Sequence, residues 1–179
     1  MRIILDALKA FLTPVVGGLL WVFCFFASVF VYADSGCTNL TSGMATMHQE
    51  EVSIINGQGK IIRFKSYIAD DNKERASGYQ HICQAIINKT TILFVYSKSV
   101  SARFHMRNVK GALDIGFFDD KGVLIKSLRM DTYDDGNSRL YYPGKPFRFA
   151  LEAKPGFFSA GNFSDGKTRL LIHSLYDED

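Results

Sequence analysis

The sequence has 179 residues, of which 21 are Lys or Arg and 18 are Asp or Glu, so the formal net charge is +3. This length accommodates one domain, with or without a targeting segment. The small net charge and the absence of any run of basic residues are not typical of a nucleic-acid-binding protein, so we expect no nucleic-acid partner.

Residues 1–33 have a basic start followed by a long apolar stretch. Arg2 and Lys9 supply the positive charges, and no charged residue occurs between Lys9 and Asp34. The stretch ends in small residues three positions and one position before Asp34, the pattern of a signal-peptide cleavage site. It is also long enough for a membrane-spanning helix. Residues 1–33 are therefore interpreted as a signal peptide or a membrane anchor, and the small-residue ending favours cleavage after Ala33.

Both interpretations predict the same topology. The basic residues precede the apolar stretch, and the next basic residue is Lys60. The positive-inside rule then places the N-terminus in the cytoplasm and the following chain outside it. We expect a periplasmic or secreted protein after cleavage, or a domain anchored to the inner membrane and facing away from the cytoplasm.

Residues 34–50 are polar and aperiodic, which predicts a linker or irregular arm, and a single β-rich domain is expected over 51–176. The domain begins with two segments rich in β-branched residues, 51–55 and 60–68, separated by Asn-Gly-Gln-Gly. This pattern predicts a β-hairpin.

A short helix is expected after this hairpin. Asp71 can accept a hydrogen bond from the backbone N–H of Glu74, whose side chain can reach back, and Gly78 is placed to end the helix. Further strands are predicted at 91–96, 100–106, 113–118, 123–130, 147–153 and 168–175, with a long loop at 131–146. Short strands separated by turns indicate a mainly β (α+β) fold: a small compact β-barrel or sandwich-like domain with one or two short helices, preceded by the N-terminal signal or anchor helix.

Several segments resemble one protein family in an unbroken order from Glu51 to Ile172. Phe-His-Met-Arg-Asn at 104–108 is similar to its Phe-Trp-Met-Lys-Asn, and Leu-Asp-Ile at 113–115 with Phe-Phe-Asp-x-x-Gly at 117–122 is similar to its Leu-Asp-Ile-x-Phe-Ile-Asp-x-x-Gly. Further similar segments are Ala69-Asp70 with Glu74-Arg-Ala76 and Gly78, Ile92-Leu-Phe94, Phe149-Ala-Leu-Glu152 and Pro155-Gly156. The chain thus resembles the bacterial and archaeal group called domain of unknown function 192. The resemblance implies a compact β-rich fold, often behind a signal peptide, and no particular reaction.

The sequence departs from this family pattern at three positions. His105 stands where the family usually has Trp, Ala112 where it has Pro, and Gln80 where it has Met. If these positions shape a binding surface, the ligand is expected to differ from that of typical members.

Two cysteines, Cys37 and Cys83, follow the apolar stretch. An even number of cysteines in an oxidising compartment predicts a disulfide, with two free thiols and a metal or redox role as the alternatives. His81 and Cys83 have the spacing of neighbours on one strand face, but no paired His or Cys motif accompanies them. We predict neither a metal nor a cofactor.

The predicted strand 100–106 carries a candidate binding surface. Phe104 and Met106 are expected on one face of the strand, and His105 and Arg107 on the other. An imidazole beside a guanidinium can bind an anion or a carboxylate. The candidate ligand-binding residues are His105, Arg107, Asn108, Asp114, Arg75 and Asp70.

Three roles are open to these residues. Asp114 could form a salt bridge with Arg75 or Arg107 that fixes loops over the core, the group could bind a ligand, or His105 could act as a general base beside Asp114. We predict a non-enzymatic extracytoplasmic module that binds a small ligand, a glycan or an envelope protein. The alternative is an envelope hydrolase or transferase that uses His105 with Asp114, although no recognised catalytic motif is present.

Overall fold

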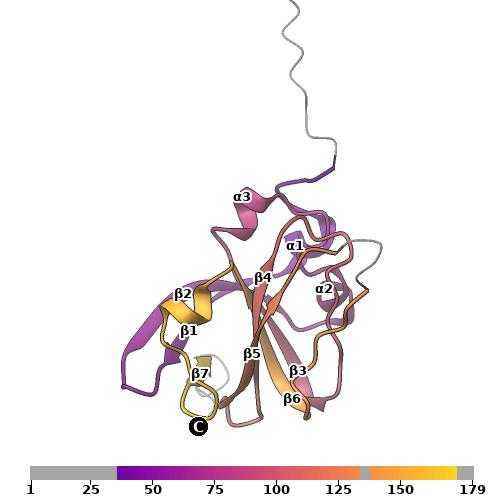
Figure 1. The fold of residues 1–179 in the computed structure, drawn as a ribbon. Coiled ribbons are helices and arrows are strands. Elements are labelled where there is room, and N and C mark those ends of the chain that lie inside the picture. Colours follow the sequence, from indigo (N-terminus) through magenta and orange to yellow (C-terminus); the bar gives the residue numbers. More distant parts are fainter. Residues whose placement is uncertain (1–35, 134–137, 173–179) are drawn as a thin grey trace, which may run out of the picture. The chain divides into compact units, whose positions relative to one another are not determined.

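The computed structural model describes residues 36–133 and 138–172, so the expected signal or anchor segment lies outside the described residues. The strands are β1 (Gln49–Ile55), β2 (Ile61–Ala69), β3 (Ile92–Val100), β4 (Leu113–Phe118), β5 (Leu124–Met130), β6 (Phe147–Ala153) and β7 (Arg169–Ile172). The helices are α1 (Ser42–Thr46), α2 (Asn72–Ser77), α3 (Gln84–Ile87) and α4 (Phe157–Ala160). The strands form one seven-stranded sheet in the order β5-β4-β6-β3-β2-β1-β7 (Figure 1). The mainly β (α+β) class is confirmed.

The two edge strands of the sheet approach each other at one end. The backbone N–H of Leu124 donates to Thr168 at 2.8 Å, and that of Leu170 donates to Gly122 at 2.8 Å. Gly122 has a φ of +74°, and a Cβ there would lie 2.5 Å from the carbonyl oxygen of Leu170, so both the turn and the close approach require glycine. Among the described residues these contacts form an isolated bridge rather than a ladder, so the sheet is not the closed barrel that we considered.

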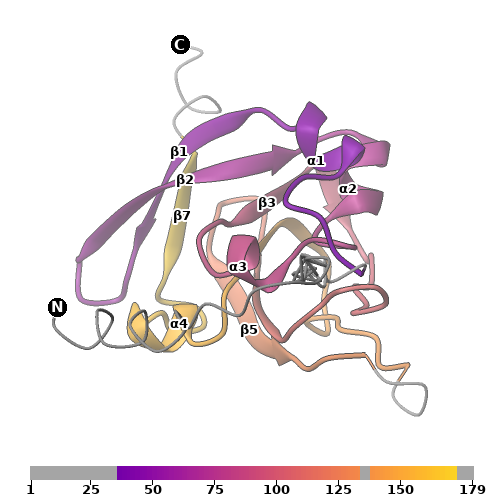
Figure 2. The same cartoon turned by 90° about the horizontal axis from the view of Figure 1, so that it is seen from above.

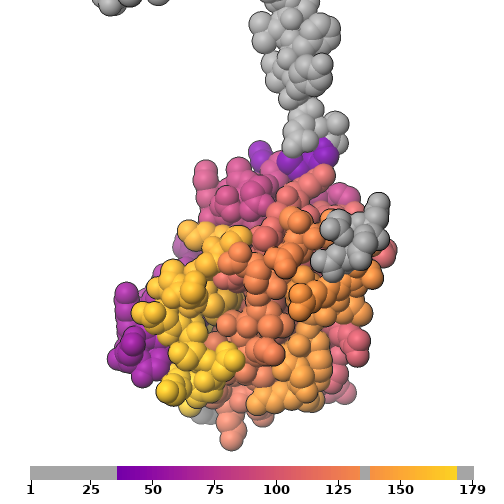
Figure 3. Space-filling model, in the orientation of Figure 1, coloured from indigo at the N-terminus to yellow at the C-terminus, as the bar shows by residue number. Residues whose placement is uncertain are grey.

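The sheet carries an apolar cluster on each face. On β3, Leu93 packs in one cluster, while its neighbours Ile92 and Phe94 pack in the other, as strand alternation requires. Helices α1 and α2 lie side by side, and α4 lies near β7 (Figure 2). The C-terminal segment that contains α4 covers part of the β1–β2 hairpin in the space-filling view (Figure 3), and Phe157 meets Phe64 edge-to-face there at 5.4 Å.

The predicted hairpin and helix are both present. β1 pairs with β2 in antiparallel orientation. In α2, Oδ1 of Asp71 accepts from the N–H of Glu74 at 2.8 Å, and the Glu74 carboxylate reaches back to the N–H of Asp70 at 3.2 Å. Gly78 ends the helix. The capping pattern therefore gave both ends of α2 correctly.

Two local predictions need correction. The expected irregular arm contains α1, where the Thr41 hydroxyl caps the helix and Met44 and Met47 are buried, and β1 begins at Gln49. The strand expected at 100–106 is instead a loop that follows β3. Its Phe104 forms an isolated bridge with Tyr141, and this bridge supports the segment without a continuous ladder.

The sulfur atoms of Cys37 and Cys83 lie 2.03 Å apart, at disulfide distance. Next to them, Thr38 exchanges backbone hydrogen bonds with His81 at 2.8 Å and with Cys83 at 2.9 Å. The N–H of His81 in turn donates to Asn108 at 2.8 Å. The cysteine pair is thereby connected through main-chain bonds to the loop after β3. Within the described part of the chain, no helix is long and apolar enough to cross a membrane.

Candidate functional site

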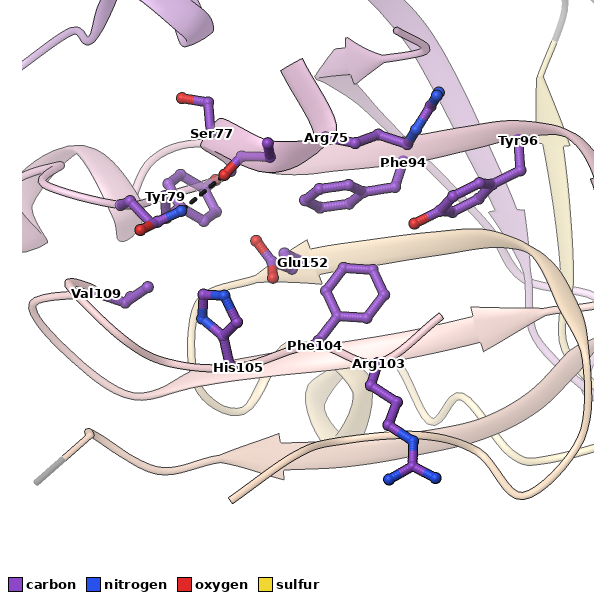
Figure 4. Close-up of a pocket in the computed structure, with 13 residues that line it drawn as sticks. Arg75, Ser77, Tyr79, Phe94, Tyr96, Arg103, Phe104, His105, Val109 and Glu152 are labelled. Atoms are coloured by element: carbon purple, nitrogen blue, oxygen red, sulfur yellow. Dashed lines mark hydrogen bonds between the residues drawn. The ribbon is translucent and has the colours of Figure 1, made fainter. Parts of the chain in front are cut away.

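A pocket of about 220 Å³ lies between α2, β3 and the loop that follows β3, and β6 contributes Glu152 to it (Figure 4). We call it the Glu152 pocket. Its aromatic lining comes from Tyr79, Phe94, Tyr96 and Phe104, and Gly78 and His105 also line it. The rings of Phe94 and Phe104 meet edge-to-face with centroids 5.0 Å apart. The pocket therefore combines a carboxyl group with aromatic walls.

Glu152 is buried in the middle of the sheet, with only 5% of its surface exposed. It lies on β6 between Ile92 of β3 and Ile115 of β4. Its carboxylate faces the pocket, and among the described residues no group donates a hydrogen bond to it or forms an ion pair with it. Burial disfavours the charged form and raises the pKa of Glu152 to about 8. The carboxyl group therefore keeps its proton near neutral pH.

The two tyrosines of the pocket remain neutral. Burial raises the pKa of Tyr79, and the nearby Glu152 charge adds to this, whereas the hydrogen bond with Thr90 at 3.0 Å opposes it. Burial also raises the pKa of Tyr96, which Arg75 opposes and Glu152 reinforces. Both tyrosines therefore line the pocket as neutral phenols.

Gly78 lies next to this carboxyl group at the end of α2. Its φ is +45°, a conformation that disfavours side chains. A Cβ at this position would lie 3.5 Å from the Phe94 ring and 3.7 Å from Oε2 of Glu152. These are ordinary contact distances, so the positive φ at the helix end, and not the space in the pocket, favours glycine at residue 78.

Arg75 borders the pocket, but backbone and side-chain acceptors already bind its guanidinium group. It donates to the carbonyl of Val95 at 2.9 Å, to Oδ1 of Asn72 at 2.6 Å, and to the carbonyl of Asp70. Its guanidinium carbon also lies 4.9 Å from the ring centroid of Tyr96. Arg75 therefore joins α2 to β3, and Asp70 takes part through its main chain.

Asp114 does not join this site. It is 6% exposed, and its Oδ1 accepts from Nε of Arg129 at 2.5 Å. Strand register places Arg129 directly opposite Asp114 in the β4–β5 pair. The salt bridge that we expected with Arg75 or Arg107 is therefore wrong in its partner, because the adjacent strand supplies the closer cation. Asp114 is also not among the residues that line the pocket with His105.

Of the remaining candidates, all of which lie in the loop after β3, only His105 lines the pocket. His105 is exposed and lines the pocket. Arg107 lies outside the lining, with its guanidinium carbon 5.9 Å from the ring centroid of Tyr133. Asn108 donates to Oε1 of Gln80 at 3.2 Å, and Gln80 lines the pocket. The structure thus brings His105 and Arg75 to one pocket, with Asn108 behind it.

Comparison with models of protein families identifies the family of this chain. The model of domain of unknown function 192 (DUF192), described as an uncharacterized ACR, matches residues 53–169. The chain belongs to the DUF192 family. No curated protein matches the chain.

Two solved structures share the DUF192 fold. A Sinorhizobium meliloti 1021 protein, given the provisional description of transcription regulator, is 19% identical with a TM-score of 0.64, and the match covers 70% of this chain and 95% of that one. A protein of unknown function from Novosphingobium aromaticivorans DSM 12444 is also 19% identical, with a TM-score of 0.61 and coverage of 75% and 99%. At this identity the likeness supports the fold alone.

Two of the three departures from the DUF192 pattern, His105 and Gln80, line the Glu152 pocket, whereas Ala112 does not. Glu152, Phe94 and the other aromatic residues of the pocket were not among the predicted site residues. An acidic residue inside the otherwise apolar strand 147–153 was the signal that could have found Glu152. Among the described residues, no group of three or more His, Cys, Asp or Glu side chains is arranged to hold a metal ion.

Proposed function

We propose that this DUF192 protein is a non-enzymatic extracytoplasmic binding module and that its binding site is the Glu152 pocket. The observation that carries the proposal is a buried carboxyl group without a partner among the described residues, at an open pocket with aromatic walls. Burying an unpaired polar group is costly. Titratable groups with perturbed pKa values cluster at functional sites, and convergent polar and aromatic groups are typical of binding sites.

The extracytoplasmic location is supported by two independent features of the chain. The apolar stretch at 10–33, preceded by basic residues, has the layout of an export signal. The disulfide distance between Cys37 and Cys83 suits an oxidising compartment, where such bonds persist. A small ligand, a glycan or a side chain of an envelope protein could reach a pocket on such a domain.

The alternative, a hydrolase or transferase that uses His105 with Asp114, has less support. Asp114 is held by Arg129 in an adjacent strand pair and does not line the pocket. A general base and the group that orients it must lie within hydrogen-bond reach of each other. We therefore favour binding over catalysis.

A pair of matched variants tests the proposed site. His105→Trp places a larger side chain at the pocket, and Arg107→Trp places the same side chain two residues away, outside the lining. Both positions are exposed, so each variant should retain its stability within about 1 kcal/mol. The protein would be screened by NMR against small amines, carboxylates, sugars and neutral aromatic compounds, with the amide signals of Gly78 and Val109 as reporters.

We expect bound compounds to shift the signals of the pocket residues in the wild type and in Arg107→Trp, and to lose affinity in His105→Trp. If compounds bind elsewhere, or bind His105→Trp as tightly as the wild type, the Glu152 pocket is not the binding site.

A further inference from the structure

We infer that the Glu152 pocket binds an alkylammonium group, from a free primary amine or from the end of a lysine side chain. This inference rests on the proposed function, because it names the ligand class of the same site. Its basis is the buried Glu152 carboxyl, which lacks a cationic partner among the described residues although basic side chains surround it.

The surrounding charged and titratable groups do not neutralise Glu152. From α2, Arg75 is bound by the carbonyls of Val95 and Asp70 and by Asn72. From the loop after β3, Arg103 points away from the pocket, whereas the His105 ring points into it (Figure 4). Neither histidine nor arginine forms an ion pair with Glu152 among the described residues. The site therefore has an ionisable carboxyl group that no described cationic side chain pairs with.

The neutral groups of the pocket favour the same ligand. The Tyr79 hydroxyl is already hydrogen-bonded to Thr90 at 3.0 Å, and it stays neutral together with that of Tyr96. The rings of Phe94 and Phe104 offer apolar surface to a short alkyl chain, and aromatic faces attract a nearby cation. An anion would instead meet the charge of Glu152 as soon as this group ionises.

The size of the pocket limits the ligand. A volume of about 220 Å³ is below the range of roughly 300–1,000 Å³ that is common for drug-sized ligands. It suits a chain of a few carbon atoms that ends in an ammonium group. An ammonium group can donate three hydrogen bonds, and a charge-assisted bond to a buried carboxylate is among the strong ones.

Binding of an ammonium group should depend on pH in a defined direction. The ligand requires ionised Glu152, and burial raises the pKa of this group to about 8. A primary amine keeps its charge well above this pH. The affinity should therefore rise roughly 50-fold between pH 6 and pH 8, as proton linkage requires.

The experiment uses the full chain in a nonionic detergent. n-Butylammonium and Nα-acetyl-lysine amide are titrated at pH 6 and pH 8 by calorimetry and NMR, with 1-butanol and methylguanidinium as comparators. Glu152→Gln keeps the shape of the side chain and removes its charge, and it should weaken ammonium binding at pH 8 by roughly 30-fold or more. The matched control is Glu51→Gln, because Glu51 is exposed on β1 and is not among the lining residues.

Binding of n-butylammonium that strengthens with pH and needs Glu152 supports the inference. Equal binding of the lysine amide points to a protein ligand, and its exclusion points to a free amine. If 1-butanol binds as well as n-butylammonium, or if only methylguanidinium binds, the ammonium class is wrong. The proposed binding site still stands in that case, provided that His105→Trp abolishes the binding. If no probe binds at pH 8 or at pH 6, the ammonium class is also overturned. The NMR screen described above then tests whether the pocket binds any other compound.

Discussion

Replacing Glu152 by glutamine should stabilise the protein near neutral pH, even though it changes the buried centre of the proposed site. Glutamine has nearly the same shape but does not ionise. In the folded protein, burial raises the pKa of Glu152 from 4.5 to about 8. The unfolded carboxyl group loses its proton above pH 4.5, whereas the folded one keeps it up to about pH 8. The folded state thus binds this proton more tightly than the unfolded state does.

The sign and size of the effect follow from this difference. Where the folded state binds more protons, the free energy of unfolding falls as the pH rises. The fall begins near pH 4.5 and ends near pH 8, and one pKa unit corresponds to about 1.4 kcal/mol. At pH 7 the contribution of Glu152 is a destabilisation of about 3 kcal/mol, which glutamine avoids. For a chain of this size, Tm should rise by roughly 6–12 °C.

Urea unfolding at pH 5, 6, 7 and 8, with the cysteine pair oxidised, measures this effect. The difference in unfolding free energy between Glu152→Gln and the wild type should grow steadily over this range, while Glu51→Gln should follow the wild type. A difference that stays constant with pH, or a variant that is less stable than the wild type at pH 7, would show that a partner stabilises the ionised carboxylate. In that case the reasoning about an unpaired acid would be refuted.

Three further predictions concern the fold and its location. Thiol labelling of the denatured, unreduced protein should find neither Cys37 nor Cys83 free, and replacing both by serine should lower the free energy of unfolding by roughly 4 kcal/mol; two labelled thiols would contradict this. Asp71→Ala removes the N-cap of α2 and should cost about 1 kcal/mol in chemical denaturation, whereas an unchanged midpoint would show that the cap contributes nothing. An alkaline phosphatase fusion after residue 60 should be active and the mature chain should begin at Asp34; an inactive fusion would place the domain in the cytoplasm.

The parts of the fold that the sequence predicted depend on short-range patterns. The α2 helix was predictable because Asp71, Glu74 and Gly78 lie within one helical segment and each acts on its own backbone neighbours. The β1–β2 hairpin was predictable for the same reason. In contrast, α1 lies in a polar, glycine-containing segment, and burial of Met44 and Met47 against the rest of the domain adds to the Thr41 cap in stabilising it there.

The loop after β3 shows why alternation alone can mislead. Phe104 and Met106 do pack inward and His105 is exposed, as a strand would require. The segment nevertheless has one isolated bridge, with Tyr141, instead of a ladder. An alternating pattern reports which side chains are buried, and it does not report whether the neighbouring backbone is a strand.

The candidate site was predicted only in part, because it is assembled by sheet register. His105 was found from its own segment, but Gly78, Phe94 and Glu152 come from three separate elements. The order β4-β6-β3 places β6 between two apolar strands, and this placement turns Glu152 from an ordinary acidic residue into a buried one. The local sequence of β6 does not predict which strands will pair with it.

The contacts at the edges of the sheet bear on how the chain acquires its structure. β1, near the beginning of the domain, pairs with β7 at its end, for instance through Val52 and Ile172. Leu170 also donates a hydrogen bond to Gly122 near the other edge of the sheet, so β7 contacts both edges. Chains dominated by such distant pairings fold slowly, because loop closure precedes the gain from contacts. A nascent chain can form these pairs only after β7 has been synthesised. For the exported protein that we propose, slow folding would keep the chain unfolded for longer before it crosses the membrane.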